Sequence, residues 1–552
     1  LYLQNPSSNT DMYNTAVGYD AGLSVTTGIQ NTLIGGLAGD AITTGGSNVA
    51  LGYLSLSATT TGGDNTAVGR SALKASTTAA NNVAVGRNAL TTVTTGSNNV
   101  GVGYSSLASL TTGNSNVALG FNSLSSDTLG DRAVAIGLSA LASQNFTSST
   151  DNYNVAVGYF AGNAVTTGVQ NTLIGGLAGD AITTGNYNVG VGYTSLSANT
   201  TGGSNIAIGN FALSANTTAS NNTAVGQSAL LANTTGASNV ALGAYALDAN
   251  TTASNNTAVG YASLGANTTG AQNTAVGTSA LDASTTASST TAIGYGALGA
   301  NTTGPENTAV GAFTLDANTT GPNNTAVGKS ALSANTTGSN QVSIGHNSLS
   351  VNTTGYRNTA VGSAAMGANT TGKFNVAMGF TALDANTTAD NNTAIGYAAL
   401  TASTTGTSNV AVGALAGDAL TTGGSNVLIG YSTGTYGANL TTGSGNVLIG
   451  PYTDSTTAGG NQAHGLGYNL DCAPSYTTLG NNASDIRAAH GNVTWATVSD
   501  ERYKKDIVDS TAGLSFINAL QPRTFKYKTL GELPETFRAY EADSTEVFKN
   551  SD

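Results

Sequence analysis

One glycine recurs at a fixed spacing through most of the chain, and this period constrains the fold more than any other feature. It closes a pentapeptide such as NTAVG and falls every 17 residues from Gly18 to Gly137, again from Gly158 to Gly430, and once more at Gly450. The chain therefore holds 26 copies of one unit. A period of this kind is typical of solenoids, in which one coil cannot bury its own apolar residues but stacked coils can.

Two insertions interrupt the period: four extra residues near Gln144–Thr147 and three near Tyr436–Asn439. The 17-residue phase resumes directly after each of them. We therefore expect both insertions to bulge from turns and leave the stack intact, so that deleting either changes stability little.

The residues of one unit predict short strands and turns. In the pentapeptide the second position is mostly Thr or Val, the fourth is Val, Ile or Leu, and the third is usually Ala. Such alternation is expected of a strand with its β-branched residues on one face. The apolar segment after the glycine predicts a second strand, and the ANTTG stretch supplies a turn. The fold class predicted is an all-β parallel solenoid or β-roll, with coils ~4.8 Å apart in a rod of roughly 125 Å.

Two positions of the unit are nearly constant. The phase glycine is present in all 26 units, which indicates a positive φ or a close approach of another backbone. The first position is Asn in 23 units, the exceptions being Ala133, Thr290 and Gln341. Stacked at one level, these amides are expected to hydrogen-bond along the rod as a ladder, a structural role rather than a ligand site.

The position after the phase glycine is aromatic in eleven units. Elsewhere it holds Arg70, Arg87, Gln227, Lys329 or His346, so this position is expected to be at least partly exposed. We interpret the aromatic row as a stabilising ladder at a corner of the coil, and stacking on sugar rings is the functional alternative. The eleven residues are Tyr19, Tyr53, Tyr104, Phe121, Tyr159, Tyr193, Tyr261, Tyr295, Phe380, Tyr397 and Tyr431.

Charge is scarce: 8% of the 552 residues are charged, and the formal net charge is −12. No basic stripe for nucleic acid is present, and no apolar run approaches the ~20 residues that a membrane-spanning helix needs. The single cysteine, Cys472, excludes an intrachain disulfide framework. Neither a metal nor a cofactor is expected, and the scattered acidic residues form no evident carboxylate pair for glycoside hydrolysis.

The last 54 residues differ from the repeats. The segment SDERYKKDI, residues 499–507, has six charged residues out of nine. Beyond it Leu514, Ile517 and Leu520 recur at helical spacing before Pro522, and RTFKYKT alternates as an edge strand does. These features predict a separate charged α+β module, of which we expect residues 499–552 to be only the start.

Repeat units such as NVAVG, NVALG and NIAIG resemble the head repeats of trimeric autotransporter adhesins, which are left-handed parallel β-rolls of three chains. The resemblance covers residues 14–467 and implies a homotrimer; the usual repeat is shorter, so the extra TTG implies a longer turn. The small third-position alanine agrees with a trimer if it lets a second apolar face pack against a neighbouring chain.

The segment SDERYKKDI, followed by LSFINALQPRTFKYK, resembles the start of the intramolecular chaperone domain first known from phage endosialidases. That domain lies at the C-terminus of tail spikes and fibres, helps three chains assemble, and then cuts itself off. The family pattern is Ser-Asp-x-Arg-x-Lys followed by Lys-x-Ile. The matching residues are Ser499, Asp500, Arg502, Lys504, Lys505 and Ile507.

The resemblance implies that Ser499 is the nucleophile of a serine peptidase, Lys504 its base, and Val498–Ser499 the bond that is cut. Asp500 and Arg502 would position the site or join chains. A serine hydroxyl needs a base to remove its proton, and a lysine serves if burial lowers its pKa toward neutrality. Such a dyad acts once on its own chain, so no turnover enzyme is expected.

These observations divide the chain into a lead-in (1–13), a β-roll shaft (14–467), a neck (468–498) and the start of a chaperone domain (499–552). They predict the shaft of a trimeric phage tail fibre or spike in the virion tail. Its partners would be two further copies, a host cell-surface receptor such as a polysaccharide or outer-membrane component, and upstream tail and baseplate proteins. The alternative is a trimeric-head adhesin on the bacterial cell surface, which needs a C-terminal membrane anchor.

Overall fold

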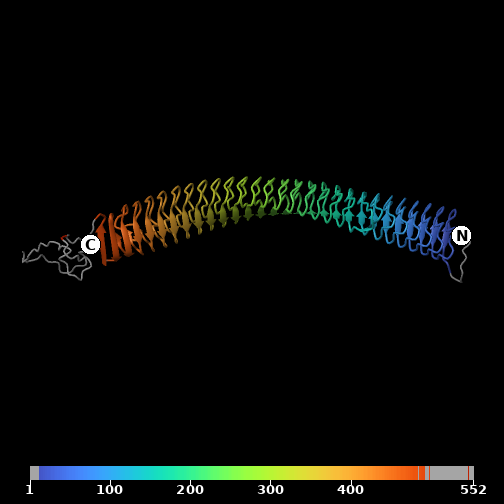
Figure 1. Ribbon diagram of the computed structural model, residues 1–552, viewed down its shortest axis with the longest axis horizontal. Helices are drawn as coiled ribbons and strands as arrows, with labels where there is room; N and C mark the ends of the chain where they lie inside the picture. The colour runs from blue at the N-terminus through green and yellow to red at the C-terminus, as the bar shows by residue number, and fades with distance from the viewer. Residues whose placement is uncertain (1–10, 483, 492–495, 498–544, 546–552) are drawn as a thin grey trace, which may run out of the picture. The chain divides into compact units, whose positions relative to one another are not determined.

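The computed structural model describes residues 11–482, 484–491, 496–497 and 545 of the chain. Close contacts divide the chain into two units, residues 1–497 and 498–552, and the strands of the described residues lie in the first unit. All regular structure among the described residues is β-strand. Figure 1 shows the first unit as a row of stacked coils, each contributing an arrow to the same sheet.

Twenty-six strands of three residues each mark the repeat units. They are β1 (Thr15–Val17), β2 (Thr32–Ile34), β3 (Val49–Leu51), β4 (Thr66–Val68), β5 (Val83–Val85), β6 (Val100–Val102), β7 (Val117–Leu119), β9 (Val134–Ile136), β11 (Val155–Val157), β12 (Thr172–Ile174), β13 (Val189–Val191), β14 (Ile206–Ile208), β15 (Thr223–Val225), β16 (Val240–Leu242), β17 (Thr257–Val259), β18 (Thr274–Val276), β19 (Thr291–Ile293), β20 (Thr308–Val310), β21 (Thr325–Val327), β22 (Val342–Ile344), β23 (Thr359–Val361), β24 (Val376–Met378), β25 (Thr393–Ile395), β26 (Val410–Val412), β27 (Val427–Ile429) and β28 (Val447–Ile449).

These strands form one parallel sheet in strict register. Each residue pairs with the residue at the same position of the next coil, as Thr257 pairs with Thr274 and Val259 with Val276. The register passes unbroken over both insertions, because Val134 pairs with Val155 and Val427 pairs with Val447. The predicted parallel β-solenoid of 17-residue repeats is therefore confirmed.

Apart from two-residue pairings beside the insertions, each repeat unit has one strand, so the prediction of two strands per unit is wrong. The apolar segment after the phase glycine forms turns, because two of its residues take left-handed backbone angles. In the coil of Gly69, Ser71 has φ 59° and Leu73 has φ 50°. An L-residue at positive φ cannot continue a strand. Leu73 is fully buried, and that burial offsets a strain of about 1 kcal/mol.

The interior of a coil is filled by the strand alanine and the turn leucine, such as Ala258 and Leu264, both fully buried. Thr257 and Val259 of the same strand lie on the opposite, outer side, where both are partly exposed. The expectation that the alanine faces a neighbouring chain is therefore wrong. It faces its own core, because the leucine leaves room for only a small side chain there.

Coils with a leucine in the strand show the same limit on volume. Leu33 and Leu173 take the place of the strand alanine, and glycine then replaces the turn leucine, at Gly39 and Gly179. A Cβ on Gly39 would lie 2.8 Å from Leu33 Cδ2, and one on Gly179 would lie 2.7 Å from Leu173 Cδ2. The two leucine positions of a coil therefore compete for one space.

The phase glycine meets both conditions inferred from the sequence. Gly260, for example, has φ 134°, and a Cβ added there would lie 2.6 Å from the carbonyl carbon and oxygen of Gly277 in the next coil. Any side chain would strain the backbone and also push neighbouring coils apart.

The predicted asparagine ladder is confirmed. Asn31 Oδ1 accepts hydrogen bonds from the backbone N and from Nδ2 of Asn48, at 3.0 and 3.1 Å. Asn48 Nδ2 also donates to the carbonyl of Gly62 at 3.0 Å. These side chains are fully buried, so the ladder satisfies polar groups that are otherwise costly to bury.

A second buried row lies at the seventh residue after the phase glycine, which we call the corner position. In the central coils it holds asparagines, and Asn233 Nδ2 donates to Asn216 Oδ1 at 3.0 Å and to the carbonyl of Gly236 at 2.9 Å. In the N-terminal coils it holds mostly other residues, among them Ile42 and Leu110, both fully buried.

The two insertions differ. Tyr436–Asn439 is exposed throughout and is closed by a hydrogen bond from Leu440 N to Gly434 O of 2.9 Å, so the predicted bulge is confirmed there. In the first insertion, however, Gln144 is fully buried and Phe146 is only 5% exposed. The exposed bulge there begins at Thr147, because Gln144 occupies the corner position and belongs to the core.

Short pairings accompany the insertions and close the stack. β8 (Gly130–Asp131) pairs with β10 (Thr150–Asp151), and β29 (Asp454–Ser455) pairs with β31 (Asp471–Cys472), both in parallel. The main sheet continues through β30 and β32 and then turns antiparallel through β33 and β34. These last strands are β30 (His464–Tyr468), β32 (Tyr476–Asn481), β33 (Ser484–Ala489) and β34 (Ala496–Thr497).

Candidate functional site

The outer side of the long sheet is an aliphatic surface. We call it the strand face and define it as the second and fourth residues of the 26 pentapeptides, such as Thr257 and Val259. The second residue is Thr, Val or Ile in every unit, and the fourth is Val, Ile, Leu or Met in every unit. No charged residue occupies either position in any unit.

Many side chains of the strand face are more than a third exposed. Scattered exposed aliphatic residues are ordinary on a protein surface, but a contiguous row along 26 coils marks an interaction surface. Parallel sheets in proteins are normally covered on both faces, and in a single chain this face is uncovered. Examples are Val17 at 58%, Leu51 at 44%, Leu242 at 46%, Ile293 at 40% and Met378 at 42%.

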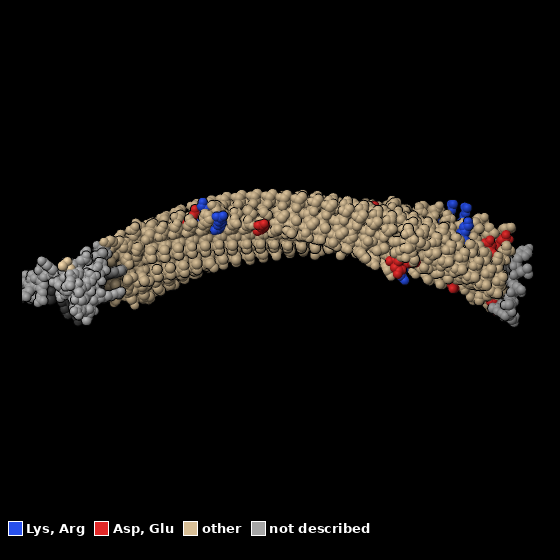
Figure 2. Space-filling view, viewed as in Figure 1, with Lys and Arg blue, Asp and Glu red and all other residues tan. Residues whose placement is uncertain are grey.

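Charged side chains lie away from the strand face. Arg70, Arg87 and Lys329 occupy the position after the phase glycine, where all three are exposed. Figure 2 shows only a few scattered charges on the visible surface. The repeat therefore tolerates charge at the position after the phase glycine and excludes it from the strand face. A surface that a partner covers needs such an exclusion of charge.

The sequence interpretation missed the strand face by assigning the alanine to the neighbouring chain. A signal for it was present, since the fourth position is aliphatic in all 26 units while the position after it accepts Arg, Lys, His and Tyr.

Aromatic rings contact each other between neighbouring coils, as the ladder interpretation predicts. Tyr104 and Phe121 stack with their centroids 5.2 Å apart, and Phe380 and Tyr397 stack at 5.9 Å. Tyr295 meets Phe313 edge to face at 5.1 Å. Such pairs contribute about 0.5–1.5 kcal/mol each beyond the area they bury.

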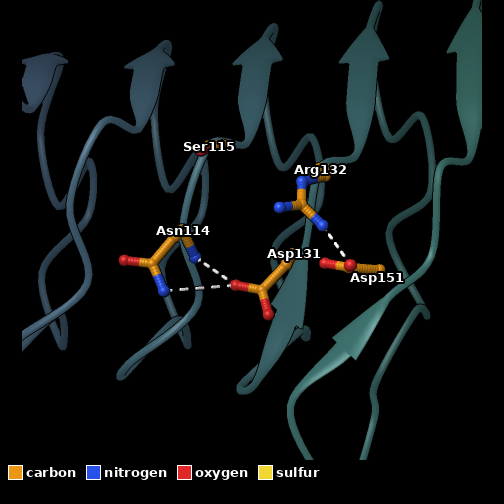
Figure 3. Close-up of a pocket in the computed structure, with 5 residues that line it drawn as sticks. All are labelled: Asn114, Ser115, Asp131, Arg132 and Asp151. Carbon is orange, nitrogen blue, oxygen red and sulfur yellow. Dashed lines mark hydrogen bonds and ion pairs between the residues drawn. The ribbon is translucent and has the colours of Figure 1, made fainter.

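A shallow polar hollow lies beside the first insertion (Figure 3). Asp131 accepts a hydrogen bond from the backbone N of Asn114, and the guanidinium of Arg132 pairs with the carboxylate of Asp151. Arg132 also donates to the hydroxyl of Tyr153 at 3.2 Å. These groups bind one another across the loop, so the hollow is a clasp for the insertion rather than a ligand site.

Two carboxyl groups are strongly buried in the described part of the shaft. Burial raises the pKa of Asp127, which accepts hydrogen bonds from Gln144 Nε2 at 2.7 Å and from the backbone N of Gly130 at 3.0 Å. Burial likewise raises the pKa of Asp454, which accepts from Gly437 N at 2.8 Å. Both hold insertion loops through these hydrogen bonds.

Two kinds of site are absent from the part of the chain that the structure describes. No group of three or more His, Cys, Asp or Glu residues there could hold a metal ion. No helix among those residues is long and apolar enough to cross a membrane.

The predicted peptidase residues Val498, Ser499, Asp500, Arg502 and Lys504 lie outside the described residues. Their roles therefore remain predictions from the motif. The described part of the shaft ends directly before them, at the edge strand β34.

Residues 499–545 match the family model described as chaperone of endosialidase. No curated protein matches the chain, and no solved structure matches it either. The match falls on the segment that the sequence separated from the repeats by its charge. A chaperone-of-endosialidase domain at the C-terminal end of a long β-solenoid fits a phage tail fibre-like protein with an intramolecular chaperone.

Proposed function

We propose that this chain forms the shaft of a homotrimeric phage tail fibre or spike in the virion tail, with a chaperone that aligns three chains and is then released by self-cleavage. The observation that carries the trimer is the strand face, uncharged through all 26 units. The match of residues 499–545 to chaperone of endosialidase supports the assembly role.

The chaperone answers a problem that the repeats create. Coils of nearly identical sequence pair equally well one unit out of register, and every strand of the sheet offers the same hydrogen bonds to its neighbour. A clamp at one end fixes the alignment of three chains before the shaft forms. Removing the clamp afterwards leaves the shaft kinetically trapped, because refolding would lack its guide.

A charge placed on the strand face tests the trimer. We expect the triple variant Val259→Lys, Val276→Lys and Ile293→Lys to lose the trimer, because each chain would bring three unpaired charges into the buried contact. The control is Thr278→Lys. Thr278 lies in the same coil as Val276 but at the exposed position after the phase glycine, away from the strand face. Sedimentation velocity reads out the state, and a monomeric wild-type protein at micromolar concentration would refute the proposal.

Self-cleavage is tested in the full-length gene product. We expect a new N-terminus at Ser499 by mass spectrometry. Ser499→Ala removes the nucleophile and Lys504→Ala removes the base, so both should abolish the cut while trimers still form. Lys504→Arg should fail as well, because a guanidinium stays protonated.

The matched control for the nucleophile is Ser510→Ala, in the same module but outside the motif, which should cleave normally. Cleavage in Ser499→Ala would overturn the dyad. Absence of cleavage in the wild-type product would leave a chaperone that is never released.

Host attachment completes the proposed function. The expected partners are a host cell-surface receptor, and upstream tail and baseplate proteins. Neighbouring genes for tail and baseplate components would support this context, and neighbouring secretion genes would favour the surface-adhesin alternative.

A further inference from the structure

Four tyrosines gather at the second insertion, near the end of the repeat stack. Tyr452 lies at the centre, with ring centroids 5.4 Å from Tyr431, 4.6 Å from Tyr436 and 5.9 Å from Tyr468. We call these four residues the tyrosine platform. Every other aromatic ring contact between tyrosines and phenylalanines in the described residues is an isolated pair.

The platform is open to solvent. Tyr436 is 60% exposed, Tyr468 50% and Tyr431 47%. Tyr431 occupies the position after the phase glycine, which elsewhere holds Arg70 and Lys329, both exposed. The platform therefore lies around the position after the phase glycine and not on the strand face, which the proposed trimer covers.

The insertion holds the fourth ring in place. Tyr436 belongs to the loop Tyr436–Asn439, whose Gly437 N donates to the buried carboxylate of Asp454 at 2.8 Å. The backbone bond from Leu440 N to Gly434 O closes the loop at 2.9 Å. An aromatic ladder along the position after the phase glycine needs no insertion. Stacking between coils therefore does not account for the position of Tyr436.

The charge around the platform is negative. Asp471 pairs in register with Asp454, and a Cβ on Gly437 would lie 3.6 Å from Asp471 Oδ1 and 3.7 Å from Asp454 Oδ2. Asp471 is exposed. No lysine or arginine occurs between Lys373 and Arg487. An anionic ligand would find repulsion and no cationic partner here, whereas hydroxyl groups of a neutral ligand could donate to Asp471.

The geometry points to a binding site for a neutral glycan on the tyrosine platform. Tyrosine rings offer rigid apolar faces for the C–H side of a sugar ring, and their hydroxyls offer hydrogen bonds. Tyr431, Tyr452 and Tyr468 belong to three successive coils and span about 10 Å, two steps between strands, which suits a short oligosaccharide. A neutral glycan would be the ligand through which the proposed fibre attaches to its host. The biological purpose of the site rests on the proposed function, but the binding itself does not.

The test is an array of neutral and uronic-acid oligosaccharides, followed by calorimetry with the neutral glycan retained best. We expect the wild-type protein to retain neutral glycans and not polygalacturonate. Tyr436→Ala should weaken binding at least tenfold, and Tyr436→Phe should keep most of it if ring stacking dominates. The matched control is Tyr295→Ala, which breaks an isolated ring pair and should leave binding unchanged.

Tyr452 contacts all three other rings of the platform, so Tyr452→Ala would disturb their packing, and Tyr468→Ala serves as the second platform variant. Retention of no neutral glycan by the wild type overturns the inference, as does equal binding by Tyr436→Ala and Tyr468→Ala. Loss of the trimer in Tyr436→Ala would show that the platform is a contact between chains. Sedimentation of each variant keeps failure of the glycan site distinct from failure of the trimeric shaft.

Discussion

The N-terminal and central coils of the shaft fill the same corner position in different ways. From Val25 to Ile182 the corner residues are mixed, with Val, Ile and Leu at six of ten positions. From Asn199 to Asn386 they are asparagine in eleven of twelve, with Ser284 as the exception. The same backbone therefore accepts either apolar residues or a ladder of amides at the corner position. The two differ in how much each residue depends on the corner residues of the adjacent coils.

An apolar corner tolerates variation, while an amide ladder works only when it is continuous. Asn267 Oδ1 and Ser284 Oγ are both buried without a hydrogen-bond partner, and the same is true of Asn386 Oδ1 and Ser403 Oγ. In each case the serine is too short to reach the asparagine of the preceding coil. The ladder thus has a cost at every interruption, which explains why asparagines occupy this position in long runs.

Exchanging the two kinds of corner should have the largest effect. Asn233→Leu would leave the buried Asn216 Oδ1 without its donor, now at 3.0 Å, and would remove one of the two acceptors of Asn250 Nδ2, now at 2.8 Å. We expect local destabilisation of about 2–4 kcal/mol. Ile42→Asn should cost about 2 kcal/mol, because an amide replaces a buried apolar side chain. Hydrogen exchange of peptides from these coils measures both, and wild-type protection in Asn233→Leu would mean that the ladder contributes nothing.

Repairing a ladder should stabilise it by a smaller amount. Ser284→Asn places an amide next to Asn267 Oδ1, in a coil whose alanine at position 287 matches the alanine at 253 beside Asn250. We expect about 1 kcal/mol of added stability in local hydrogen exchange. Ser284→Ala, the control, only removes an unpartnered hydroxyl and should be close to neutral. A destabilised Ser284→Asn would show that the break serves a structural purpose.

The stability of the coil at Asp127, an ionisable residue at the corner position, should depend on pH. Coils with uncharged asparagines at that position should not show this dependence. Burial raises the pKa of Asp127 above its usual 3.8, so the folded state binds its proton more tightly than the unfolded state. Stability near this coil should then fall as pH rises from about 3.8 through the raised pKa, and recover on acidification. Asp127→Asn should remove this dependence. Protection of residues 120–150, corrected for intrinsic exchange rates, is compared between a pH just below 3.8 and pH 7 in both proteins.

Deleting exposed insertion residues should have the smallest effect. Removal of Thr147–Ser149 takes away residues that are exposed in the structure, and we expect a loss of less than about 1 kcal/mol. Removal of Tyr436–Asn439 also takes away exposed residues, but it removes Gly437 N, which donates to the buried carboxylate of Asp454, so it should cost more. Gln144→Ala should cost more, because Gln144 Nε2 is a hydrogen-bond partner of the buried Asp127 carboxylate. Thermal unfolding followed by circular dichroism ranks the variants, and a severe defect in either deletion would make that loop a structural clamp.

Much of the shaft could be predicted from the sequence because it depends on local rules repeated 26 times. The phase glycine implied the close approach now seen between Gly260 and Gly277, and the first-position asparagine implied the ladder from Asn31 to Asn48. The motif SDERYKKDI, which begins at Ser499, predicted the match of residues 499–545 to the family model of chaperone of endosialidase. The tyrosine platform was not predicted, because Tyr452 and Tyr468 lie outside the aromatic row and Tyr436 reaches Tyr452 only through an insertion.

The sequence by itself determined the period, the parallel stack, the register across both insertions and the place where the chain changes character at residue 499. Only the tertiary structure decided which side of each strand faces inward and how many strands a coil has. Alternation reveals two faces but not which of them is inside, since that depends on the volume left in the coil. Leu264, held at φ 52°, fills that volume, so the alanine turns inward and the aliphatic residues form the strand face.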